Sequence, residues 1–303
     1  MDRVLISLIP ILLLATFLFG FRTLILLAVV CLTGLITEYA AMRLVNGSKA
    51  KVSESALVSC FLFTLTLPPA TPYWVAALGI AFGLFFGKGV FGGFGKNIFN
   101  PALIGRCFIY ISFPAYLTVR WTEPFSRFPG GLIRYDSGVD AITSATPMVA
   151  AQGGSPDYLS LLSGLTAGSL GETSAVLILA AAIYLLVTRS ASWIIMLSTF
   201  GGFISLSTIL YITGVIQTDP LAAVLSGGIL FAVVFMATDP VSAPGQLISK
   251  IIYGALIGIL SVAIRNFSLF TEGVMFAVLI ANAFVPLIDR QVKTLTARKK
   301  VTA

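Results

Sequence analysis

Charged side chains are scarce in this sequence. They make up 10% of its 303 residues, while apolar residues make up 57% and the mean hydropathy is +1.00. A soluble globular protein carries about 25% charged residues, so this chain has too few of them to cover a water-facing surface. The shortage excludes a soluble globular protein and places the chain in lipid.

Histidine is missing, and cysteine is rare. Cys31, Cys60 and Cys107 stand singly within apolar runs, and no C-x-x-C occurs. The lack of histidine excludes histidine-ligated haem and histidine-based catalysis within these residues. The cysteine spacing speaks against an iron–sulfur or zinc site built by this chain alone, and we expect the three thiols to be small buried groups.

Long apolar runs fill most of the chain. They are continuous, which favours helices over the alternating strands of an outer-membrane barrel. No A-x-A cleavage pattern follows the first run, which we therefore interpret as a span and not a signal peptide. We predict an all-α polytopic membrane protein with about ten transmembrane helices, at roughly 4–19, 22–44, 55–67, 73–87, 100–114, 173–188, 192–213, 219–236, 248–264 and 273–288.

The net charge of +7 does not indicate nucleic acid, because the positive residues lie between the spans and near the end of the chain. This is the positive-inside pattern of a membrane protein. It predicts an inner-membrane protein with both termini cytoplasmic and these residues inside: Arg43, Lys49, Lys51, Lys88, Lys96, Arg189, Lys250, Arg290, Lys293, Arg298, Lys299 and Lys300.

Three regions follow from this topology. Residues 1–114 form a first membrane half, 115–171 an extracytoplasmic loop, and 172–303 a second membrane half. The loop is far longer than a typical connection, which suggests a function. Pro-rich breaks at Leu67-Pro68-Pro69 and Asp239-Pro240 interrupt corresponding places of the two halves, as in proteins with an internal repeat.

A hydroxyl-rich segment lies in the predicted outer loop. By composition alone it is a polar turn, although a threonine oxygen can also carry a phosphoester. The residues concerned are Asp140, Thr143, Ser144, Ala145 and Thr146, followed by Pro147.

A glycine-rich run from 87 to 101 carries Asn97 and Asn100, which share one face if the segment is helical. Each amide offers both a donor and an acceptor, so the pair could recognise the uracil-like edge of a flavin. Gly95-Lys96 is not followed by Ser or Thr, so the run is not a nucleotide-hydrolysing phosphate loop. The alternative is a glycine-rich cytoplasmic turn whose lysines follow the positive-inside rule.

Two acids lie at the ends of predicted spans. Asp239 follows the eighth span on the cytoplasmic side, where it is either a functional carboxylate or a solvated helix-end residue. Glu172 precedes the sixth span, where it either caps the helix or serves an ion path or cofactor. Glu38 lies within the second span.

Taken in order, these segments resemble the family that joins the RnfD protein of the Rnf complex with the NqrB protein of the sodium-pumping NADH:quinone reductase. The resemblance covers nearly the whole chain and rests on the following motifs: Leu67-Pro68-Pro69, Asn97-Ile98-Phe99-Asn100-Pro101-Ala102, Gly171-Glu172-Thr173-Ser174, Met236-Ala237-Thr238-Asp239-Pro240 and Glu272-Gly273-Val274-Met275.

The resemblance implies a urea-channel-like fold of two pseudo-repeated halves, and FMN held by a phosphoester on Thr146. The family motif D-x-x-[S/T]-G-A-T matches this chain except that Ser144 stands where glycine is usual. A flavin transferase installs this FMN. A second, noncovalent flavin, riboflavin in the reductase, would contact Asn97, Asn100 and Asp239.

The resemblance further implies an electron-transfer subunit, not catalytic alone, that couples electron flow to Na⁺ or H⁺ transport. Its partners would be membrane lipid and the other proteins of the complex, including an FMN-bearing periplasmic-facing subunit and iron–sulfur subunits. We favour an Rnf-type ferredoxin:NAD oxidoreductase, partly because the chain starts at its first span. The alternatives are the NqrB-type subunit of the Na⁺-translocating NADH:quinone reductase, with quinone reduced near Asn97 and Asn100, and a channel or permease.

Overall fold

A computed structural model of the chain describes residues 1–47, 51–118, 158, 162, 168–172, 174–226, 228–268 and 273–301. The secondary structure of this part of the chain is helical, without strands. The predicted all-α class is therefore confirmed for these residues.

The elements of the first half are α1 (Asp2–Phe19), α2 (Arg22–Asn46), α3 (Glu54–Leu65), α4 (Tyr73–Leu84), the π-helix η2 (Phe85–Gly89), α5 (Pro101–Ser112) and α6 (Pro114–Thr118). Those of the second half are α9 (Ala175–Val187), α10 (Trp193–Ile212), α11 (Pro220–Leu225), α12 (Ile229–Phe231), the π-helix η3 (Ala232–Met236), α13 (Leu247–Phe267) and α14 (Gly273–Val301).

Five described helices, α1, α2, α10, α13 and α14, are long and apolar enough to cross a membrane. Four shorter apolar helices occupy Glu54–Leu65, Tyr73–Gly89, Pro101–Ser112 and Ala175–Val187. The span expected at 219–236 is broken into α11, α12 and η3. The chain is therefore a multi-pass membrane protein, but half of the ten expected spans are shorter or interrupted helices.

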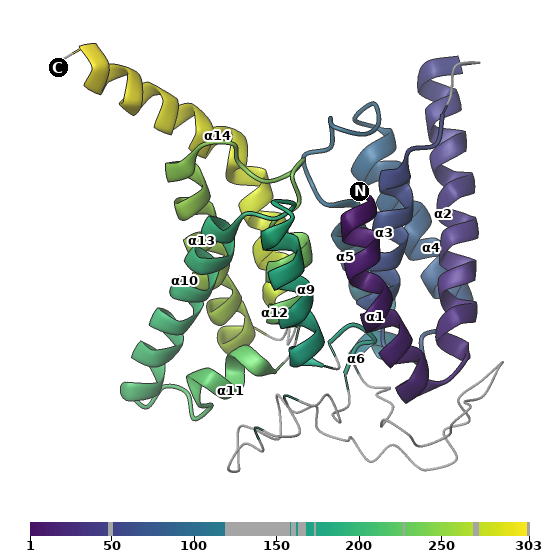
Figure 1. The fold of residues 1–303 in the computed structure, drawn as a ribbon, viewed down its shortest axis with the longest axis horizontal. Helices are drawn as coiled ribbons and strands as arrows, with labels where there is room; N and C mark the ends of the chain where they lie inside the picture. Colours follow the sequence, from purple (N-terminus) through teal and green to yellow (C-terminus); the bar gives the residue numbers. More distant parts are fainter. Residues whose placement is uncertain are drawn as a thin grey trace.

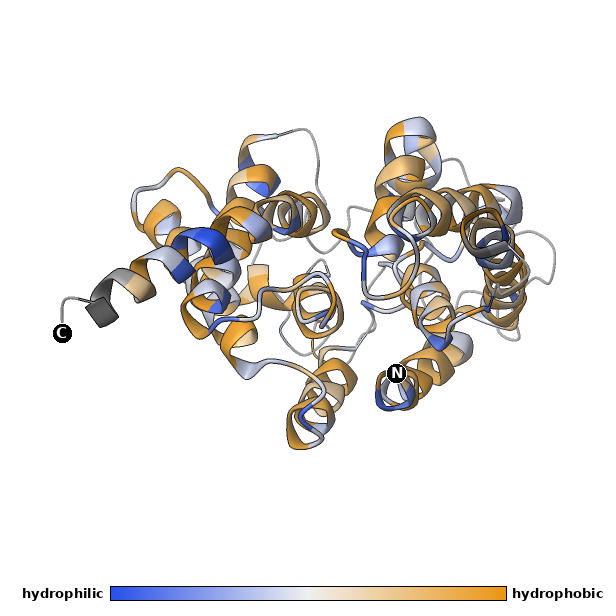
Figure 2. Ribbon diagram, turned by 90° about the horizontal axis from the view of Figure 1, so that it is seen from above, coloured by the Kyte–Doolittle hydropathy of each residue, from blue (hydrophilic) through white to orange (hydrophobic). Residues whose placement is uncertain are grey.

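The helices form two groups, with α1 to α5 on one side and α9 to α14 on the other (Figures 1 and 2). Within the first group α4 packs against α2 and α5, and within the second α13 packs against α10 and α14. The groups meet where α1 contacts α9 and α5 contacts α14. Apolar residues cover most of both groups when seen from above (Figure 2).

Glycines set the close approach of α10 and α13. A Cβ atom on Gly202 would lie 2.6 Å from the Ala255 carbonyl oxygen, and one on Gly258 would overlap the Thr199 carbonyl oxygen. Helices in lipid associate through such contacts, because small residues let the backbones touch.

Helix ends inside the protein have partners. The Asn100 side chain caps α5 by accepting a bond from the Ala102 N–H at 3.0 Å. Beyond the end of α3, the backbone N–H groups of Leu170 and Gly171 donate to the carbonyls of Leu67 and Leu65. These bonds let short helices stop within the molecule without leaving polar backbone groups in an apolar environment.

Adjacent glycines of α10 provide a matched test of this packing. We expect Gly202→Ala to lower the stability of the purified protein by about 1–3 kcal/mol, because the added methyl group overlaps the α13 backbone. Gly201 has nothing within 4 Å of an added Cβ, so Gly201→Ala should leave stability unchanged or slightly raised. Thermal unfolding in detergent measures both, and equal effects of the two substitutions would contradict the assignment of Gly202 to the contact.

Candidate functional site

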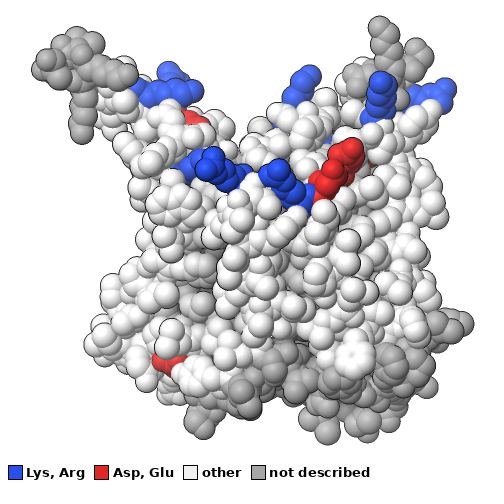
Figure 3. Space-filling view, in the orientation of Figure 1, with Lys and Arg blue, Asp and Glu red and all other residues white. Residues whose placement is uncertain are grey.

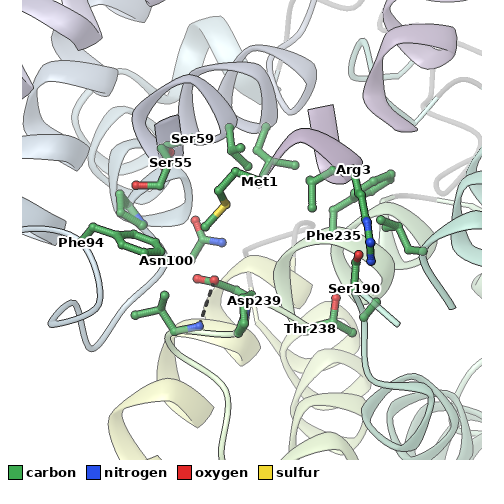
Figure 4. Close-up of a pocket in the computed structure, with 18 of the residues that line it drawn as sticks. Met1, Arg3, Ser55, Ser59, Phe94, Asn100, Ser190, Phe235, Thr238 and Asp239 are labelled. Atoms are coloured by element: carbon green, nitrogen blue, oxygen red, sulfur yellow. Dashed lines mark hydrogen bonds between the residues drawn. The ribbon is translucent and has the colours of Figure 1, made fainter. Parts of the chain in front are cut away.

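A cavity of about 400 Å³ opens near the start of α1, with walls from both helix groups (Figure 4). Small-molecule sites in proteins have volumes of roughly 300–1,000 Å³. Its polar lining includes Lys88, Asn97, Asn100 and Asp239, and Phe94 and Phe235 supply aromatic surface. The cavity therefore combines apolar walls with a few convergent polar groups.

Asn97 and Asn100 reach the cavity from the segment between η2 and α5, and both are buried. The Asn97 Nδ2 donates to the Phe99 carbonyl at 3.1 Å, which holds the loop in place. The Asn100 Oδ1 is used as the cap of α5. This cap leaves the amide nitrogen of Asn100 available to a ligand in the cavity (Figure 4).

Asp239 enters from the second helix group, directly after η3. Its Oδ1 accepts a bond from the Val241 N–H at 3.2 Å and its Oδ2 accepts one from the Ser242 hydroxyl at 3.1 Å. The residue is half-buried because its carboxyl group faces the cavity while protein surrounds the rest. Burial raises the pKa of this carboxyl above its ordinary value, and the two hydrogen bonds and the nearby Lys88 ammonium counteract the rise in part.

The structure thus brings Asn97, Asn100 and Asp239 into one cavity, although Asp239 is far from the other two in the sequence. Their role as flavin contacts stays a prediction. The hydroxyl-rich segment with Asp140, Thr143, Ser144, Ala145 and Thr146 lies outside the described residues.

Lys88, which the sequence places among the cytoplasmic lysines between spans, is buried in the structure. Its side chain is 2% exposed, and its Nζ lies 2.7 Å from the Glu38 Oε1. The same ammonium donates to the Ser53 hydroxyl at 2.6 Å and to the Ser55 hydroxyl. Glu38, in α2, is also buried, so the two charges form an ion pair inside the protein.

A sequence signal for this pair exists. A carboxylate within a long apolar helix is unfavourable in lipid and usually has a partner. Lys88 is the lysine at the end of the apolar run 73–87, and the π-helical turn η2 buries it instead of exposing it. Periodicity does not show a π-helical turn, and the lysine therefore looks like a loop residue.

Both π-helices border the cavity. Lys88 of η2 lines one side, and Val234 and Phe235 of η3 line the other. π-helical turns often occur at functional sites. Each of the two is followed by a segment that supplies cavity residues, Asn97 and Asn100 in one case and Asp239 in the other.

Basic side chains gather at the cavity end of the molecule (Figure 3). The exposed Lys and Arg residues of the described part of the chain include Arg3, Arg43, Lys51, Lys96, Arg189, Arg290 and Lys293. Their common end agrees with the arrangement expected from the positive-inside rule.

A second charged contact lies where the two helix groups meet. An Arg106 Nη1 is 4.0 Å from the Glu172 Oε1, and the Arg106 Nη2 donates to the Ser169 hydroxyl at 3.3 Å. Ser174 is the N-cap of α9, and its side chain accepts a hydrogen bond from the Leu177 N–H. Glu172 instead packs against Gly228, where an added Cβ atom would overlap its Oε1.

Comparison with known proteins matches residues 1–297 to the model of the NQR2, RnfD, RnfE family. A relative from Ectopseudomonas mendocina (strain ymp), named as the B subunit of a Na⁺-translocating NADH-quinone reductase, is 40% identical over 270 residues, covering 84% of this chain and 63% of its own length. A protein of the same name from Chromohalobacter salexigens is 40% identical, covering 79% of this chain and 58% of its own length. Another from Azotobacter vinelandii is 36% identical, covering 84% of this chain and 63% of its own length. The chain therefore spans about three fifths of these relatives.

The buried ion pair makes a prediction about stability. We expect Lys88→Met to destabilise the protein by about 3–5 kcal/mol, because Glu38 would keep a buried charge without its partner. The double variant Lys88→Met with Glu38→Gln removes both charges and should recover most of that loss. Thermal unfolding of the two variants and the wild type measures the coupling, and a double variant no more stable than Lys88→Met would argue against coupled charges.

Proposed function

The chain belongs to the NQR2, RnfD, RnfE family, and from this membership we propose that it is an electron-transfer subunit of an ion-translocating oxidoreductase. The names of its relatives support the NADH:quinone reductase alternative over the Rnf complex favoured by the sequence motifs. We accordingly propose a role like that of the relatives' B subunit, in which the chain passes electrons within a larger complex that moves Na⁺ and reduces quinone.

The observation that carries this proposal is the convergence of Asn97, Asn100 and Asp239 on one cavity. Amide and carboxyl groups together offer both donors and acceptors, which suits the mixed hydrogen-bonding edge of a flavin ring. Phe94 and Phe235 offer apolar faces beside them (Figure 4). The residues present therefore fit a noncovalent flavin, riboflavin in our proposal.

The residues of this cavity would have distinct tasks. Asn97 and Asn100 orient the ring edge, while the half-buried Asp239 carboxyl can exchange a proton close to it. The apolar remainder of the wall excludes water, which strengthens each polar contact. The flavin would supply the capacity to take up and release one or two electrons.

A second flavin belongs to the proposal, as FMN joined to Thr146 within the motif that begins at Asp140. The basic end of the molecule carries the cavity, and we propose that this end faces the cytoplasm, with Thr146 on the opposite side of the inner membrane. The two flavins would then serve a transmembrane electron relay that partner proteins complete. A flavin transferase would attach the FMN.

We also propose that the two helix groups are pseudo-repeats and that the ten helical segments cross or enter the membrane in a urea-channel-like arrangement. The matching order of elements supports this: each group has a π-helix, followed by a segment that reaches the cavity. Half-length helices that meet within the protein are a recurrent feature of membrane folds with internal repeats.

Covalent attachment is tested on a denaturing gel. Protein produced in a host that supplies the flavin transferase should give a fluorescent band, and Thr146→Ala should abolish the fluorescence, because it removes the oxygen on which the motif places FMN. Thr143→Ala is the matched control and should retain at least part of the signal. A dark wild-type band would remove the covalent flavin and favour a channel or permease, which solute flux in vesicles would then test.

The noncovalent site is tested by Asn100→Asp, which keeps the oxygen that caps α5 but removes the amide donors. We expect the variant to fold and to bind added riboflavin about fivefold more weakly or worse, since one hydrogen bond to a ligand contributes roughly 1 kcal/mol or more. Fluorescence quenching of riboflavin in a Thr146→Ala background measures the affinity. Equal binding by both proteins would place the flavin elsewhere.

A further inference from the structure

The positive end of the buried Lys88–Glu38 ion pair faces the cavity. An ion pair that only holds two helices together would not need this orientation. Lys88 and Ser55 line the cavity wall, whereas Glu38 lies behind them and is 2% exposed. A ligand in the cavity is therefore closer to the ammonium than to the carboxylate. The pair acts as a fixed dipole with its positive end toward the ligand.

The charged groups around the cavity are few. Among the described lining residues, Asp2 and Arg3 stand at the start of α1 and are exposed, while Asp239 and Lys88 lie deeper. Exposed charges are screened by water and salt. Lys88 is thus the buried cation of the described lining, and it faces Asp239 from the opposite helix group.

The position of the ammonium is fixed. The carboxylate of Glu38 and the hydroxyls of Ser53 and Ser55 accept from it, so all three of its N–H donors have partners in the wall. The group cannot swing into the cavity to bind a ligand directly without giving up these bonds. Its influence on a ligand in the cavity is accordingly electrostatic and does not need a direct hydrogen bond.

From this arrangement we infer that Lys88, held by Glu38, is a positioning residue that favours the electron-rich, reduced form of the ligand bound in the cavity. The inference rests on the proposed noncovalent flavin. Adding electrons to a bound ring adds negative charge or draws in a proton, and a buried positive end nearby stabilises the added charge. The site would therefore hold reduced riboflavin more tightly, relative to oxidised riboflavin, than the same cavity without the pair.

The measured quantity is the ratio of the affinities for reduced and oxidised riboflavin. A redox titration of the bound and free flavin gives this ratio, followed by absorbance in the full-length protein with Thr146→Ala, so that the noncovalent flavin alone contributes. Four proteins are compared in that background: the parent, Glu38→Gln, Lys88→Arg, and the charge-free pair Lys88→Met with Glu38→Gln.

The expected shifts have opposite signs. Measured at a pH low enough for the unpaired ammonium to keep its proton, Glu38→Gln leaves that ammonium uncompensated and should raise the ratio by on the order of tenfold, whereas the charge-free pair should lower it by a similar factor. Lys88→Arg keeps the charge and should stay close to the parent. A purely structural ion pair would change stability in these variants without opposite changes in the ratio.

The outcomes separate the inference from the proposed function. Riboflavin bound by all four proteins with the same ratio would overturn the role of Lys88 and leave the noncovalent site intact. Parent protein that binds no riboflavin would overturn the noncovalent site and the inference together. Shifts of one sign in both charge variants would also count against the inference, because they would reflect a general loosening of the cavity.

Discussion

A helix that ends inside a membrane protein leaves backbone N–H and C=O groups that lipid cannot satisfy. This constraint shapes the centre of the molecule. Carbonyls at the end of α3 and just after it pair with the N–H groups of Leu170 and Gly171, and Asn100 caps the start of α5. Because these ends can be satisfied only inside the protein, the short helices must meet one another there. The start of α5 is also a wall of the cavity, and the irregular segments that precede α5 and follow η3 carry Asn97, Asn100 and Asp239 into it.

The two walls of the cavity differ in charge. The first helix group contributes the cationic end of the Lys88–Glu38 pair, and the second contributes the carboxyl group of Asp239. The ammonium is held by three acceptors, whereas within the described part of the chain Asp239 accepts from one backbone N–H and one serine hydroxyl. One wall is therefore a fixed electrostatic element and the other a group that can take up or release a proton. A fixed positive charge opposite a carboxyl group suits a site at which a bound group gains and loses electrons and protons.

The sequence is informative where apolar length and residue order carry the signal. Each predicted span overlaps helix in the described residues, although only five of these helices are long enough to cross a membrane. The sequence motifs select Asn97, Asn100 and Asp239, which the structure brings into one cavity. The burial of Lys88 could not be predicted from the sequence, because a π-helical turn changes the direction of a side chain without changing the composition of the segment. The interruption of 219–236 could not be predicted for a related reason. Hydropathy is averaged over a window and does not show a local break such as the one at Gly228, which has a left-handed backbone conformation.

The separation of 50 residues between Glu38 and Lys88 also bears on how the protein is made. Chains are synthesised from the N-terminus at about 5–20 residues per second, so α2 emerges from the ribosome before its cationic partner exists. An acid at the centre of a lone helix disfavours insertion by roughly 2.5–3.5 kcal/mol on translocon scales. Apart from this residue α2 is strongly apolar, which favours its insertion, and Glu38 stays without Lys88 until η2 is made. The ion pair can therefore form only after η2 has been made, and it then joins two helices that were synthesised separately.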